Sequence, residues 1–135
     1  MSTPTPELVR VRRRLEGRPD QIAEARRMIS RVVGTESPAH DVARLLVSEA
    51  ATNALLHSAS GELGGSLEVR CQLEDRRRLR VEVRDQGSAK KPRPRAHARD
   101  ALSGRGLELL DALAECWGSS GGPEGHTVWF ELEVA

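Results

Sequence analysis

Aromatic residues and cysteines are scarce in this chain of 135 residues. Tyrosine is absent, phenylalanine occurs once and tryptophan twice, so leucine, valine and alanine must supply most of a hydrophobic core. The two cysteines, Cys71 and Cys116, are too few and too isolated for a disulfide framework or a zinc site. We therefore expect both to be reduced, unreactive core residues.

Long apolar runs and an excess of charge of one sign are also missing. No stretch is long enough to cross a bilayer and no N-terminal segment has signal-peptide character, so we expect a soluble, cytoplasmic protein with no membrane partner. The 21 basic and 20 acidic residues leave a net charge of +1, which gives no general reason for nucleic-acid binding. The basic run Val9–Arg14 could contact phosphates, but its alternation fits an edge strand with a solvated face. We expect no direct nucleic-acid partner.

The apolar residues that are present suffice for one domain. The hydrophobic fraction is 38%, and no repeat or boundary divides the chain, so we expect a loose lead over residues 1–7 and a single domain over residues 8–135. Alternating apolar residues predict five strands: Leu8–Glu16, Leu67–Glu74, Leu79–Arg84, Glu115–Ser119 and His126–Val134. Helical periodicity predicts three helices: one from an N-cap at Asp20 to about Val33, one capped by Ser37 from about Pro38 to Ser58, and one ending near Ala114.

The order of these elements indicates an α+β fold. Two helices follow the first strand, and a strand pair, a third helix and a second strand pair come after them. The simplest arrangement is a two-layer sandwich, in which a mixed, mostly antiparallel sheet is covered on one face by helices.

The most informative segment is Ser48–His57, inside the second predicted helix. Glu49 and Asn53 are one helical turn apart and share an angular sector with four apolar residues, Val42, Leu45, Leu46 and Leu56. Arg44, Ser48 and Thr52 fall on the wetter side. Burying a polar group without a partner costs about 2–7 kcal/mol, and nothing else on this helix can satisfy the two side chains. A bound ion or polar ligand is the natural partner.

A second polar residue is predicted to point inward at the end of a strand. Asp85 lies two residues after Val83, so strand alternation gives both side chains the same, inner face. Gly87 follows and permits a close turn of the chain. An Asp-x-Gly sequence after a strand is also a common turn, and the residues alone leave both interpretations open.

The stretch from Gln86 to Ser103 has no periodicity and is rich in basic residues, which favours a lid over an anionic ligand. Gly104-Arg105-Gly106-Leu107 then opens the third helix, and a helix N-terminus offers free N–H groups to a phosphate. The spacing matches neither a dinucleotide-binding fingerprint nor a P-loop.

Taken in order, these motifs resemble the nucleotide-binding domain of the gyrase, heat-shock chaperone and histidine-kinase ATPase superfamily (GHKL), which has the Bergerat-type fold. Within it, the chain is most similar to the free-standing anti-sigma-factor serine/threonine kinases of bacteria. The segments that carry the resemblance are Ser48–His57, Ser103–Leu107 and Thr127-Val128-Trp129-Phe130. One departure is that the second glycine of the family's Asp-x-Gly-x-Gly is Ala89 here.

The resemblance implies a role for each candidate residue. Asn53 would hold a Mg²⁺ that bridges the ATP phosphates, and Glu49 would orient or deprotonate the attacking nucleophile. Asp85 would accept a hydrogen bond from the adenine amino group, with Gly87 letting the base approach the backbone. The remaining nucleotide contacts would come from Gly104, Arg105, Gly106, Leu107 and, at the adenine end, Thr127.

Of the residues in these motifs, His57 has two interpretations and Thr127 has an added geometric requirement. His57 fits the family pattern, but a histidine near a helix C-terminus is often only a favourable end residue, so assisting and structural roles both stay open. Strict alternation puts Thr127 on the face opposite Val128, so its contact with adenine requires a bulge or a later strand start.

The function implied by the resemblance is an ATP- and Mg²⁺-dependent protein serine/threonine kinase. Its substrate would be a small anti-anti-sigma protein of the STAS type, it could also sequester a sigma factor, and we expect a homodimer. The alternative is a non-catalytic nucleotide-binding module that grips a regulatory protein. The presence of Glu49 beside Asn53 favours the kinase, because a pure binding module needs no base.

Overall fold

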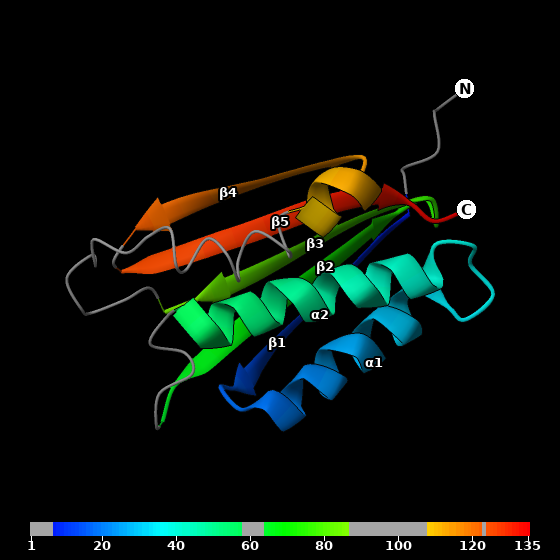
Figure 1. The fold of residues 1–135 in the computed structure, drawn as a ribbon. Helices are drawn as coiled ribbons and strands as arrows, with labels where there is room; N and C mark the ends of the chain where they lie inside the picture. Colours follow the sequence, from blue (N-terminus) through cyan, green and yellow to red (C-terminus); the bar gives the residue numbers. More distant parts are fainter. Residues whose placement is uncertain (1–6, 58–63, 87–107, 123) are drawn as a thin grey trace.

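The computed structural model describes residues 7–57, 64–86, 108–122 and 124–135, which form two layers. One layer is a five-stranded sheet, and the other contains the helices α1 and α2, which lie across one face of that sheet (Figure 1). The predicted α+β sandwich is confirmed. The opposite face of the sheet carries no helix within the described residues, and we call it the open face.

The strands are β1 (Leu8–Glu16), β2 (Ser66–Glu74), β3 (Arg78–Asp85), β4 (Cys116–Gly122) and β5 (Gly125–Glu133), in the spatial order β1-β2-β3-β5-β4. All four pairings are antiparallel, so the described sheet is not mixed. The β4 strand continues three residues beyond the predicted Ser119. The residues Ser120, Gly121 and Gly122 are of types that favour a turn, but they extend the strand because β5 pairs with it as far as Gly122↔Gly125.

The helices are α1 (Ile22–Val33) and α2 (His40–His57), with a short 3-10 turn over Pro19–Gln21 before α1. The predicted N-cap at Asp20 is wrong. Asp20 lies inside the 3-10 turn, and its carboxylate accepts a hydrogen bond from Arg18 Nε at 3.1 Å instead of capping the helix. Ser37 does act near the start of α2, since its Oγ accepts from the Ala39 N–H at 3.1 Å.

The core lies between the helices and the covered face of the sheet. Alternate residues of β2, β3 and β5 point into it, and Phe130, Val81 and Leu79 are fully buried. Residues 108–113 form a further short helical segment, from which Leu110 joins the same core. Cys71 is buried there, which raises the pKa of its thiol to about 12 and agrees with an unreactive role. Cys116 is only half-buried and lies on the open face beside Arg78 and Glu131, so its expected place in the core is wrong.

Candidate active site

Three elements meet at one end of the sheet and bring the candidate residues together. β3 ends at Asp85, β5 begins beside it through the pairing Asp85↔His126, and the C-terminal half of α2 lies over the same end (Figure 1). The covered face therefore has an apolar middle and a polar end.

Small residues set how α2 sits on the sheet. Its buried stripe contains Leu46, Val47 and four alanines, Ala43, Ala50, Ala51 and Ala54. Because the alanine side chain is short, this stripe lets α2 approach the sheet closely. The alanines therefore lie at the centre of the buried side of the helix. Glu49 and Asn53 consequently lie at the margin of the buried face and are each half-buried. Of the apolar residues expected to share their sector, Leu46 is buried and Val42 packs against the core, whereas Leu45 and Leu56 are 40% and 60% exposed.

The Asn53 side chain has an unused hydrogen-bond acceptor. Its Oδ1 atom is buried and has no hydrogen-bond partner among the described residues. Leaving a buried acceptor without a hydrogen bond costs about 1–3 kcal/mol of folding stability. Such an acceptor is therefore expected where a ligand supplies the missing hydrogen bond. A carboxamide oxygen is a ligand that magnesium accepts, so Asn53 fits the role of a metal ligand.

The other buried side-chain atom without a partner in the described ranges is Arg44 Nε, on the opposite flank of α2. Its situation differs, because a guanidinium has two further nitrogens and this side chain is half-exposed. The Arg44 charge therefore reaches water, whereas Asn53 Oδ1 is the only acceptor on its amide. Of the two, Asn53 is the one that indicates a ligand.

The Glu49 side chain lies one helical turn before Asn53 on α2. No hydrogen bond or ion pair joins it to any residue in the described part of the chain. A half-buried carboxylate without a cationic partner can accept a proton from a hydroxyl placed within hydrogen-bond reach. The pair thus presents a metal-type ligand and a base from one helical face.

Asp85 is the inward acid at the end of β3. Strand alternation gives it the face of Val83, and its side chain is only 10% exposed. The Oδ2 atom lies 3.8 Å from Nδ1 of His126, an ion pair when the imidazole is protonated. A buried carboxylate at the rim of an apolar layer can accept a hydrogen bond from an amino group, which is the role expected for adenine recognition.

Thr127 lies on the other side of the sheet from Asp85. The β3–β5 register runs without a bulge from Arg78↔Glu133 to Asp85↔His126, and it pairs Thr127 with Arg84 on the open face. The contact between Thr127 and adenine required a bulge or a later strand start, and the structure shows neither, since β5 already begins at Gly125. The residue of β5 that shares the face of Asp85 is His126, which our sequence reasoning did not select. Counting two residues back from Val128 along the strand would have identified it.

Several candidate residues lie outside the described residues, namely Gly87, Gly104, Arg105, Gly106 and Leu107, together with the predicted lid after Gln86 and the side chain of His57. Among the residues that are described, no three His, Cys, Asp or Glu side chains gather into a metal site. None of the helices in this part of the chain is both long enough and apolar enough to span a membrane.

The family comparison agrees with this geometry. A search of curated proteins found no match to the chain. The sequence model of the histidine kinase-like ATPase domain matches residues 15–132, which include α1, α2, β2, β3, β4 and all but the last residue of β5. Only the last two residues of β1 fall inside the match. The match thus contains Glu49, Asn53, Asp85 and His126. With its antiparallel sheet and covering helices, the chain belongs to the histidine kinase-like ATPase domain family and is an ATP-binding domain of the GHKL type.

Proposed function

We propose that this protein is a serine/threonine kinase that transfers phosphate from Mg-ATP to a small anti-anti-sigma protein. The observation that carries the proposal is the Glu49–Asn53 pair, in which a carboxylate lies one turn from a buried carboxamide oxygen and neither group has a partner among the described residues. Membership of the ATPase family supports the ATP part of the proposal. The choice of substrate rests on the resemblance of Ser48–His57 to the anti-sigma-factor kinases.

In this mechanism each side chain has one task. Asp85 accepts a hydrogen bond from the adenine amino group and so selects the base. Asn53 Oδ1 would hold a magnesium ion, which would neutralise charge on the phosphates when bound. The Glu49 carboxylate accepts the proton of the attacking serine or threonine hydroxyl as that oxygen forms its bond to the γ-phosphorus. The bond from this phosphorus to the bridging oxygen breaks in the same step, and ADP leaves.

The proposal also includes the oligomeric state, the partners and the cellular location of the protein. The protein would work as a homodimer in the cytoplasm, would bind a sigma factor when its substrate is phosphorylated, and would contact neither nucleic acid nor membrane directly. The Glu49 carboxylate favours the kinase over the alternative, a nucleotide-dependent binding module, because nucleotide binding alone requires no base at this position.

The test is transfer of labelled phosphate from ATP to a purified STAS-type protein, with Glu49→Gln as the variant. The amide keeps the shape of the side chain and removes its basicity, so we expect transfer to fall at least about 100-fold while Mg-ATP binding is retained. A wild-type protein that binds Mg-ATP and the partner but transfers nothing would favour the binding module.

A further inference from the structure

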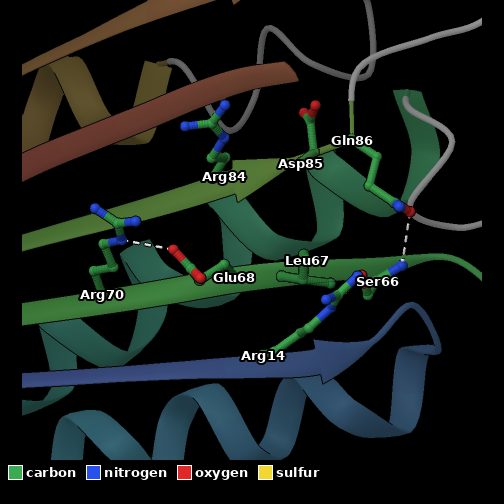
Figure 2. Close-up of a pocket in the computed structure, with 8 residues that line it drawn as sticks. All are labelled: Arg14, Ser66, Leu67, Glu68, Arg70, Arg84, Asp85 and Gln86. Carbon is green, nitrogen blue, oxygen red and sulfur yellow. Dashed lines mark hydrogen bonds and ion pairs between the residues drawn. The ribbon is translucent and has the colours of Figure 1, made fainter. Parts of the chain in front are cut away.

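One end of the open face has more arginines than carboxylates to pair with them. The register places Arg14, Glu68 and Arg84 side by side on β1, β2 and β3. Adjacent strands lie about 4.8 Å apart, so the Cα atoms of the two arginines are about 10 Å from one another, with Glu68 between them. All three residues line a cavity of about 260 Å³ that is open to solvent (Figure 2).

Glu68 does not neutralise the arginines beside it. Its carboxylate accepts a hydrogen bond from Arg70 Nε at 2.6 Å and lies 3.9 Å from Arg12 Nε. Figure 2 shows the Glu68 side chain directed toward Arg70, along its own strand. One carboxylate thus serves two arginines of the same face, and two further arginines at this end have no counter-ion among the residues that the structure describes.

Arg14 and Arg84 are these two remaining arginines. Arg14 Nε donates a hydrogen bond to Ser66 Oγ at 2.9 Å, and Arg84 makes no hydrogen bond or ion pair within the described part of the chain. Both side chains are exposed. Asp85 also lines the cavity, but it belongs to the covered face, where His126 is its neighbour.

Guanidinium groups bind the paired oxygens of carboxylates and phosphates through parallel N–H donors. We propose that this cavity is a docking site for an acidic side chain of a partner protein, which Arg14 and Arg84 hold from either side. The proposal concerns the face opposite α2 and does not depend on phosphate transfer.

The charges on the rest of the open face favour a protein partner over a nucleic acid. Beyond Arg84, the β3 and β5 half of this face carries Glu82 and Glu131, which pair with Arg78 and Arg80. Glu133 of the same half pairs with Arg77. A phosphate backbone needs a continuous positive track, and this half offers none. A single acidic group fits the local excess of charge.

The test measures binding of a fluorescent oligoglutamate peptide to the full chain at physiological ionic strength. The variant pair Arg14→Gln and Arg84→Gln removes both donors, and we expect it to weaken binding about tenfold. The matched control is the pair Arg76→Gln and Arg77→Gln in the hairpin at the other end of the sheet, where the side chains are 80% and 66% exposed. It removes the same charge far beyond the Debye length of about 8 Å, and we expect a change of less than about twofold.

A second variant tests the site without removing an arginine. Ser66→Asp places a carboxylate beside Arg14, so it should block the peptide while leaving the melting temperature equal or higher. Equal binding by all variants would overturn the proposal. So would tighter binding of a duplex DNA probe through the same arginines, or inorganic phosphate displacing the peptide at equal concentration, which would indicate a small-anion pocket.

Discussion

The two faces of the sheet deal with polar groups in opposite ways. On the open face, charges are abundant and mostly satisfy one another: Glu131 accepts from both Arg78 and Arg80 at 2.8 Å, and Arg80 lies 4.2 Å above the Trp129 ring. On the covered face, polar side chains are few, and the buried acceptor atom Asn53 Oδ1 has no partner in the described ranges.

The difference between the two faces indicates which polar groups are informative about a ligand. Exposed charges that pair with one another or with water say little about a ligand, and only an unbalanced group such as Arg14 and Arg84 indicates one. A buried acceptor has no such alternative, and leaving it unpaired costs stability unless a ligand supplies the missing bond. Stability and function are therefore separable on the covered face.

The largest effect should come from the middle of the covered face. Phe130 is fully buried, and Phe130→Ala should lower the free energy of unfolding by about 3–5 kcal/mol because it removes apolar contacts and leaves a cavity. Urea unfolding of the protein without nucleotide measures the change.

The neighbouring Trp129 points to the open face and provides the control. Trp129→Ala loses the stack with Arg80, worth about 0.5–1 kcal/mol at an exposed site, together with partial burial. Its effect should be clearly smaller than that of Phe130→Ala. Equal losses would mean that the open face carries as much of the stability as the core.

A smaller effect of opposite sign is expected at the polar end. Asn53→Ala removes the unpartnered acceptor and improves helix propensity, so the protein without nucleotide should become more stable by about 1 kcal/mol. Thr52→Ala is the matched control, because Thr52 is exposed and its substitution changes helix propensity by a similar amount. If Asn53→Ala is the less stable of the two variants, the amide has a structural partner and the interpretation is wrong.

The smallest effect should come from the paired charges. The hydrogen bond from Arg80, helped by Arg78, holds the pKa of Glu131 below its ordinary value. A carboxyl whose pKa is lower in the folded state stabilises the protein above the unfolded-state value, about 4.3, and this stability is lost as the pH falls through the folded-state pKa.

Glu131→Gln should therefore cost less than about 1 kcal/mol at neutral pH and should flatten the loss of stability below about pH 4. Melting temperature against pH is the measurement. The same change at Glu124, which is exposed and makes no ion pair with the described residues, should leave the acid limb of the curve unaltered.

Most of the fold was predictable because its patterns are strong. The alternation in Leu67–Glu74 and Leu79–Arg84 predicted the central hairpin to within a residue at each end. Local sequence patterns predicted the ends of helices and strands less well where a tertiary contact competes with them. Arg18 takes the carboxylate of Asp20 away from the helix start, and pairing with β5 extends β4 through residues that favour a turn.

The candidate site was predictable in part, for a similar reason. Helical spacing identified Glu49 and Asn53, and alternation gave the direction of Asp85. Periodicity alone could not show that the alanines, rather than Leu45 and Leu56, form the buried stripe of α2, because side-chain size decides which face can approach the sheet. Nor could it show which side-chain atoms would be left without partners, since that depends on every neighbour in the fold.

The central claim is that the buried oxygen of Asn53 exists to bind magnesium carried by ATP. Calorimetric titration of ATP into the wild type and Asn53→Ala, with and without Mg²⁺, tests it most directly. Our account predicts that Mg²⁺ tightens ATP binding by the wild type at least about tenfold and has little effect on the variant. An equal magnesium effect in both proteins would contradict it.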